Sequence, residues 1–200
     1  MFPENEIPAF CSQLILVKGH ANNSFKCTLQ LFVKDGEEEW RPVSEVISAV
    51  AGKNGWATKK KEGDGRSPVG VYSLGEVFGY SGVKPGWMKM DYIPSDEKLF
   101  CIDDPESELY NQIASAENYP SRPWGSAENM LRQDDLYKWG IVINYNTEKP
   151  VPGLGSCIFI HVWRNAETGT EGCIAMNENN MVSLLKRLDK KKNPTIIMHT

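Results

Sequence analysis

The sequence has no long apolar run, so a helix that crosses a membrane is not expected in this chain. A membrane-spanning helix needs about 20 consecutive apolar residues, and no segment approaches that length. Residues 1–19 also lack the charged start and apolar core of a secretory signal peptide. The sequence therefore predicts either that the protein is not exported by that route or that a leader has been removed.

Positive charge is also scarce, which argues against nucleic acid as a partner. The chain has 22 lysines and arginines against 26 aspartates and glutamates, a net charge of −4, and no dense basic patch for a phosphate backbone. Only three histidines occur, none of them in an H-E-x-x-H motif, and no two cysteines form a C-x-x-C pair. We therefore expect no metal site and no other cofactor.

Cysteine occurs in an odd number, so at least one of the five thiols has no partner within the chain. Cys101 and Cys157 would form a disulfide in an oxidising compartment, whereas reduced thiols in the core are an equally good interpretation. The pairing of Cys11 and Cys27 stays open as well. Cys173 differs from these four because of the residues around it.

The overall composition is that of a globular protein. Hydrophobic residues make up 40% of the 200-residue chain and charged residues 24%, and this length suffices for a full core. Repeats and low-complexity linkers are missing, which predicts a single domain over residues 1–200. We expect this domain to be a monomer.

Strands dominate the predicted secondary structure. Residues 43–50 fit both a helical stripe and a strand that places Val46, Ser48 and Val50 on one face. A polar turn over residues 63–68 leads into a further strand. The clearer strands are predicted from short apolar or alternating segments at 13–17, 25–33, 140–145, 156–163 and 195–198.

An insertion and a helix complete the predicted organisation. Residues 81–138 are rich in turn formers and predict an irregular insertion over the sheet, with a candidate short helix at 107–116. Residues 178–189 give the clearest helix, capped by Asn177. Its buried stripe follows i, i+3, i+4, i+7 spacing and consists of Met181, Leu184, Leu185 and Leu188.

One histidine and one cysteine suggest nucleophilic chemistry. His161 lies near the end of a predicted strand, and Cys173 follows it across the polar loop 164–172. A thiolate is the attacking species, so a catalytic cysteine needs a nearby base. If the loop folds back, Cys173 lies beside His161. Gly172 would then let the backbone approach a substrate closely. The spacing alone fits a buried core thiol and a hydrogen-bonded imidazole equally well.

Two blocks of residues carry a resemblance to a known family. The first runs from His161 through Gly169-Thr-Glu-Gly-Cys-Ile-Ala-Met176, and the second is Gly63-Asp-Gly-Arg-Ser-Pro-Val-Gly-Val-Tyr72. Both resemble the L,D-transpeptidase catalytic domain (YkuD-like), and they occur in the expected order. The resemblance extends over residues 11–199, with 81–138 matching only loosely. It implies a mixed, β-rich (α+β) fold, a sandwich or barrel with a helix after the catalytic cysteine.

The resemblance also implies acyl transfer on peptidoglycan stem peptides. Cys173 would attack a carbonyl and form a thioester, with His161 as general base and later as general acid. A backbone carbonyl often orients this histidine in the family. Thr170 would order the loop or contact the substrate. The backbone amides of Gly172 and Cys173 would form the oxyanion hole.

Two departures from the family pattern leave substrate recognition open. Ala175 occupies a position where many members carry an arginine, and Glu171 replaces a frequent histidine. Arg164 is a candidate for holding a substrate carboxylate in place of that arginine. The other candidates for substrate binding are Trp163, which shares a strand face with the histidine, Tyr92 and Asn144.

The function predicted from these residues is that of a peptidoglycan L,D-transpeptidase in cell-wall biogenesis and cell shape. An L,D-carboxypeptidase or amidase on the same scaffold, a non-catalytic cell-wall binding module and a secreted effector against another cell's wall are the alternatives. The resemblance implies a periplasmic or secreted, wall-associated protein.

Overall fold

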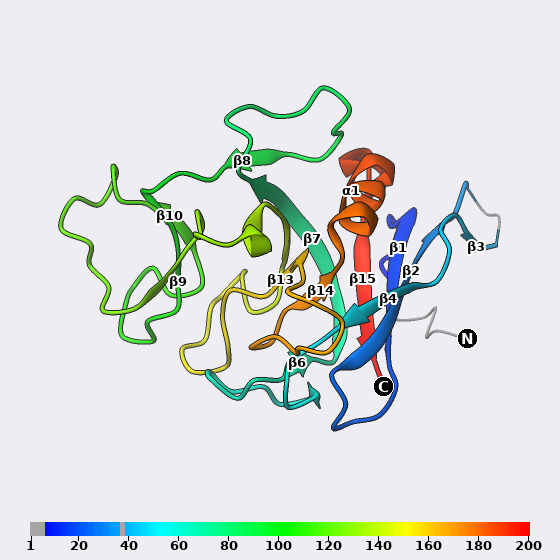
Figure 1. Cartoon of the computed structure of the whole chain (residues 1–200), viewed down its shortest axis with the longest axis horizontal. Coiled ribbons are helices and arrows are strands. Elements are labelled where there is room, and N and C mark those ends of the chain that lie inside the picture. The colour runs from blue at the N-terminus through cyan, green and yellow to red at the C-terminus, as the bar shows by residue number, and fades with distance from the viewer. Residues whose placement is uncertain (1–6, 37–38) are drawn as a thin grey trace.

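The computed structural model describes residues 7–36 and 39–200, and strands make up most of its regular structure (Figure 1). Residues 1–6, which begin the segment examined for an export signal, and residues 37–38 lie outside this described part. The strands are β1 (Gln13–Gly19), β2 (Lys26–Val33), β3 (Arg41–Pro42), β4 (Ile47–Val50), β5 (Trp56–Ala57), β6 (Ser67–Pro68), β7 (Gly70–Gly79), β8 (Tyr92–Pro94), β9 (Leu99–Ile102), β10 (Ile113–Ser115), β11 (Ala127–Asn129), β12 (Trp139–Ile143), β13 (Phe159–Val162), β14 (Ile174–Met176) and β15 (Thr195–His199). The helices are η2 (Asp135–Tyr137), α1 (Glu178–Arg187) and η3 (Lys190–Lys192).

Eight of the described strands close into a barrel. Their order is β1-β15-β7-β12-β13-β14-β4-β2, and β2 pairs back onto β1. The pairs β1–β15 and β13–β14 are parallel, and the remaining pairs of the ring are antiparallel. The expected mixed, β-rich fold is therefore confirmed, in its barrel form.

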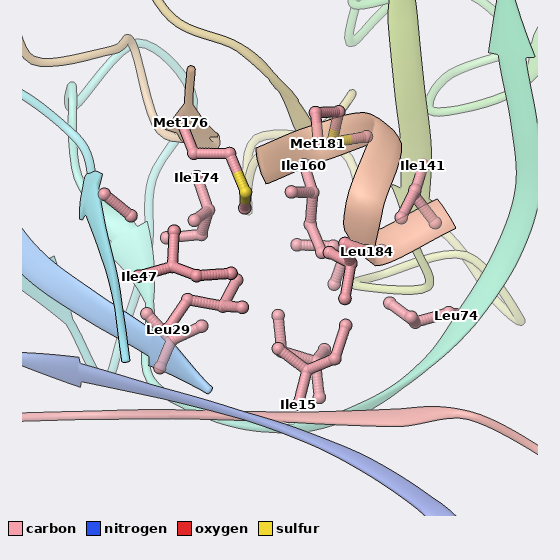
Figure 2. Packing of buried hydrophobic residues seen from close by; sticks show 14 of the residues in the cluster. Ile15, Leu29, Ile47, Leu74, Ile141, Ile160, Ile174, Met176, Met181 and Leu184 are labelled. Atoms are coloured by element: carbon pink, nitrogen blue, oxygen red, sulfur yellow. The ribbon is translucent and has the colours of Figure 1, made fainter. Parts of the chain in front are cut away.

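Apolar side chains that alternate along the strands fill the barrel. In β2 every second residue from Cys27 to Val33 is buried, and the residues between them are partly exposed. Figure 2 shows Ile15, Leu29 and Ile160 converging on one cluster. Burying each such side chain contributes about 1.5–3 kcal/mol, so this cluster fixes the strands that carry the candidate site.

The ambiguous segment 43–50 contains a strand, β4, rather than a helix. Ile47 is buried in the barrel core, whereas Val46 and Ser48 are exposed. The reason is the pairing with β2, which sets Ile47 beside the interior residue Leu29. The strand interpretation is thus confirmed, and the pairing with β2 decides that Ile47, not Val46 or Ser48, faces the barrel core.

Helix α1 forms where the sequence predicts it, although it ends at Arg187 rather than at residue 189. The side chain of Asn177 accepts a hydrogen bond from the Asn180 amide at 2.8 Å, which confirms the predicted cap. The helix packs on the barrel core (Figure 2). Its stripe residues are each at most 2% exposed: Met181, Leu184, Leu185 and Leu188.

The insertion at 81–138 contains a small sheet of its own, in the order β10-β9-β11. Strands β9 and β10 lie to one side of the barrel in Figure 1. The helix considered for residues 107–116 does not form. Asn111 adopts a left-handed φ of 61°, which ends any helical run, and Ile113 instead pairs with Cys101 across the sheet.

A disulfide joins this insertion to the barrel. Cys101 on β9 is bonded to Cys157, which lies just before β13, across a sequence separation of 56 residues. Cys11, Cys27 and Cys173 are free and buried. The structure thus resolves the open question about Cys101 and Cys157 in favour of pairing.

We predict that reducing this disulfide destabilises the protein by about 2–4 kcal/mol, because the bond restricts a long loop in the unfolded chain. Urea denaturation with and without a reductant measures the effect, and Cys101→Ser should lose the same stability and no longer respond to the reductant. Cys27→Ser removes a buried free thiol and serves as the control that still responds. An unchanged midpoint after proven reduction of the wild type would contradict the prediction.

Candidate active site

The candidate site lies on the outer face of β13, between the barrel and the insertion. Side chains alternate along this strand. Ile158, Ile160 and Val162 belong to the interior cluster, whereas Phe159 belongs to a second cluster with residues of the insertion. His161 follows Phe159 by two residues and therefore shares its outward face.

Cys173 reaches the same face through the parallel pairing of β13 and β14. Ile160 pairs with Ile174 and His161 with Ala175, so the position before β14 lies beside Phe159. The Phe159 amide accordingly donates to the sulfur of Cys173, at 3.3 Å. Cys173 and His161 are thus diagonal neighbours on one face, with Cα atoms about 8 Å apart from ordinary sheet spacings.

Both side chains line one cavity of about 550 Å³. Each residue is only 7% exposed, so the thiol and the imidazole have little contact with solvent. Four other predicted site residues line the same cavity: Trp163, Arg164, Thr170 and Gly172.

The remaining two candidates for substrate binding lie elsewhere. The Tyr92 hydroxyl donates to the Ser81 carbonyl at 2.7 Å, because β8 pairs with β7 away from β13 and β14. Asn144 follows the end of β12, donates to the Ser73 hydroxyl at 2.9 Å and lines a different cavity. Neither lines the cavity that holds Cys173.

Thr170 holds the turn before the cysteine. Its hydroxyl donates to the Cys173 carbonyl at 2.6 Å and accepts from the Gly172 amide at 3.1 Å. The Gly172 amide is therefore already bonded, which differs from the predicted oxyanion hole of two amides. An oxyanion-binding role for the Cys173 amide stays a prediction.

Ser67, which belongs to the block of residues 63–72, supports the same turn. Its hydroxyl donates to the Gly172 carbonyl at 2.7 Å and accepts from the Gly52 amide at 2.9 Å. Gly172 has a φ of 149°, and a Cβ there would stand 3.0 Å from the Arg66 carbonyl oxygen. Glycine is therefore required at this position. Sequence reasoning assigned Ser67 only to a turn.

The surroundings of His161 keep its imidazole neutral. Its Nδ1 lies 2.8 Å from the Val162 carbonyl oxygen, which can only accept, so Nδ1 carries the proton and Nε2 keeps a lone pair. Burial lowers the pKa of His161 to about 4. The ring also packs edge-on against Tyr137 at 5.2 Å between centroids. At neutral pH this imidazole is a proton acceptor.

Cys173 is a neutral thiol in the same environment. Burial raises its pKa to about 12, the charge of Glu128 adds to the rise, and the Phe159 amide opposes it. The sulfur also lies 3.5 Å from the Cys157 carbonyl oxygen, to which its proton points. The resting pair is therefore thiol and imidazole, not thiolate and imidazolium.

Three carboxyl groups from distant parts of the chain line the same cavity: Glu62, Asp103 and Glu128. Burial raises the pKa of Glu128 to about 7, and its Oε2 accepts a hydrogen bond from the Tyr137 hydroxyl. One oxygen of Asp103 is buried and has no hydrogen-bond partner among the described residues. No spacing in the sequence connects these positions, so sequence reasoning missed them.

Basic side chains line the cavity as well. Lys60 is buried and pairs with Asp64 at 2.7 Å. Arg132 makes two bonds to Asp134, at 2.8 and 2.9 Å. Arg164 is exposed. The cavity thus offers both signs of charge next to a thiol and an imidazole, an arrangement suited to a ligand with its own charged groups.

Among the described residues, no group of three or more histidine, cysteine, aspartate or glutamate side chains is arranged to hold a metal ion. Nor does that part of the chain contain a helix long and apolar enough to span a membrane.

Comparison with known proteins identifies the family. The sequence pattern of the L,D-transpeptidase catalytic domain (YkuD) matches residues 23–197. The chain therefore belongs to that family. No curated protein matches it. The solved structure of Bdellovibrio bacteriovorus Bd1075 is similar at a TM-score of 0.49 and 16% identity, over 96% of this chain and 49% of the other. The chain thus spans about half the length of that protein.

We predict that His161 and Glu128 affect stability oppositely as pH changes. Between about pH 4 and 6.5 the unfolded chain protonates His161 and the folded chain does not, so His161 makes stability rise with pH. Between about pH 4.5 and 7 the folded chain retains a proton on Glu128 that the unfolded chain has released, so Glu128 makes stability fall as pH rises. Each effect amounts to about 3 kcal/mol over its window.

Urea denaturation between pH 4 and 7 separates the two effects. Relative to the wild type, His161→Gln should lose stability as pH rises, and Glu128→Gln should gain it. Superimposable pH profiles for the wild type and both variants would show that neither group titrates as described.

Proposed function

We propose that this member of the L,D-transpeptidase catalytic-domain family is a peptidoglycan L,D-transpeptidase with Cys173 as its nucleophile. The carrying observation is the shared outward face of β13 and β14, on which Cys173 and His161 line one cavity. In this proposal the sulfur attacks the carbonyl of an L-centre that is linked to a terminal D-amino acid. The D-amino acid leaves, and a thioester remains.

Proton transfer follows from the neutral state of the pair. Nε2 of His161 accepts the thiol proton as the carbon–sulfur bond forms, and the imidazolium then returns it to the nitrogen of the leaving amino acid. The Cys173 amide stabilises the negative charge that develops on the carbonyl oxygen. In the second half, an amine of a neighbouring stem attacks the thioester, His161 takes its proton, and the thiol is regenerated.

The low exposure of Cys173 is the observation that favours a second candidate, a cell-wall binding module without activity. A thiol that is 7% exposed and has a pKa of about 12 is poorly reactive toward simple reagents. The position of Cys173 at the wall of the 550 Å³ cavity supports the catalytic proposal, because a ligand in that cavity would contact the sulfur.

The proposed location is outside the cytoplasm, in the periplasm or at the cell wall. The Cys101–Cys157 disulfide supports it, since such bonds persist in oxidising compartments. A substrate in the wall and a role in cell shape are parts of the same proposal.

Mass spectrometry of the intact protein after incubation with a carbapenem tests the nucleophile. We expect one adduct with the full mass of the drug on the wild type, because opening the lactam ring releases no leaving group. Cys173→Ala should form none. Cys27→Ala removes another buried free thiol and should be acylated like the wild type. A wild type that stays unmodified, or a Cys173→Ala protein that still reacts, would support the binding-module candidate.

Incubation with a tetrapeptide stem and an amine acceptor tests the reaction. We expect released D-alanine together with a new amide product, at least 100-fold less of both with His161→Gln, since general acid–base catalysis contributes about 10²–10⁴-fold. Release of D-alanine without a new amide would replace the transpeptidase proposal by an L,D-carboxypeptidase.

A further inference from the structure

Lys60 is a buried lysine at the wall of the catalytic cavity. Its side chain is 3% exposed and its ammonium pairs with Asp64 Oδ1 at 2.7 Å. Burying an ammonium group is costly, and surrounding structure has to hold it in place. Gly155 makes room for its stem, because a Cβ at that glycine would stand 2.7 Å from Cε of Lys60. The site for this cation is thus built into the fold.

The ammonium of Lys60 points toward the turn that precedes the nucleophile. A Cβ placed on Gly172 would lie 3.4 Å from Nζ of Lys60, and both residues line the cavity with Cys173. The charge of Lys60 also acts on the sulfur, where it opposes the burial that raises the pKa of Cys173. A ligand bound over Cys173 would therefore lie within reach of this ammonium.

The bonding of Lys60 leaves capacity for a ligand. An ammonium has three donors, and two described acceptors lie near it: Asp64 Oδ1 at 2.7 Å and the Lys61 carbonyl at a long 3.4 Å. The other cations of the cavity are less buried than Lys60. The Arg132 side chain pairs with Asp134 and is 36% exposed, and Arg164 is exposed.

The acidic part of the cavity disfavours an anion. The carboxyl groups of Glu62, Asp103 and Glu128 line it, and like charges repel. A negatively charged part of a substrate therefore has its best position against Lys60. Ala175, which also lines the cavity, supplies no charge there.

We propose that Lys60 binds the terminal carboxylate of the acyl donor and so selects peptides that end in a free acid. This inference rests on the proposed function for its substrate class. In the proposed reaction the leaving D-amino acid carries that carboxylate next to the scissile bond. Holding it at Lys60 fixes the carbonyl carbon against the sulfur of Cys173.

Binding measured without turnover tests the inference. The Cys173→Ala protein is titrated with two tetrapeptide stems that differ only in their last group, a free carboxylate or a carboxamide. We expect the free acid to bind about tenfold more tightly, the ratio that one charge-assisted hydrogen bond supports. Lys60→Gln should reduce this ratio to below about twofold, whereas Lys60→Arg should retain most of it.

Lys98→Gln is the matched control, because this lysine also pairs with a carboxylate, Glu117 at 2.6 Å, but is 56% exposed in the insertion. It should keep the full preference for the acid. In the active enzyme, Lys60→Gln should raise KM for the free acid and leave KM for the carboxamide unchanged.

Three results would overturn the inference: a preference for the acid that survives Lys60→Gln, equal binding of both peptides by the protein that retains Lys60, or binding of neither. The second and third of these results are obtained with the protein that retains Lys60, so they can be observed even if the Lys60→Gln protein fails to fold. These outcomes are separate from the proposed function, because acylation by a carbapenem tests the nucleophile without reference to the acid preference.

Discussion

The parallel register between β13 and β14 is the constraint on which the candidate site depends. It places Cys173 directly beside Phe159 and diagonally across from His161, on the outward face of the barrel. A shift of one residue would turn the sulfur into the barrel core. Two backbone hydrogen bonds oppose such a shift. The Thr170 amide donates to the Ala51 carbonyl, and the Thr170 carbonyl accepts from the Lys53 amide, so the loop before Cys173 is bonded to the segment that follows β4.

The insertion covers this outward face of the barrel, so that the residues on it are buried. It contributes Glu128 and Tyr137 to the cavity, and the Cys101–Cys157 bond holds its sheet against the segment that enters β13. Burial is the main cause of both pKa shifts at the centre, upward for the thiol and downward for the imidazole. The barrel thus positions the thiol and the imidazole, and the insertion adds Glu128, whose charge raises the pKa of Cys173 further.

Local patterns in the sequence predicted the features that depend on neighbouring residues. The stripe of helix α1 and its Asn177 cap follow from periodicity and capping chemistry, and both form as expected. Features that depend on pairing with distant residues escaped prediction. Pairing with Leu29 on β2 decides which face of β4 is buried. Asn144 donates a hydrogen bond to Ser73, and Lys60 lines the cavity only in the folded chain, since it is distant in sequence from Cys173. The same holds for Glu128, which no motif distinguishes from a surface carboxylate.

In the proposed reaction, a neutral thiol and a neutral imidazole in a buried cavity would make the first step depend on a bound substrate, because no thiolate is present at rest. Separating their charges in the empty cavity is unfavourable, because a low dielectric penalises both ions. In the proposed reaction this cost falls when the proton moves as the bond to carbon forms, since the negative charge then develops on the carbonyl oxygen, where the Cys173 amide would stabilise it by donating a hydrogen bond. Only a carbonyl held against the sulfur opens that path. If Lys60 holds a terminal carboxylate as proposed, this contact would position the carbonyl against the sulfur and so act on the rate of the first step.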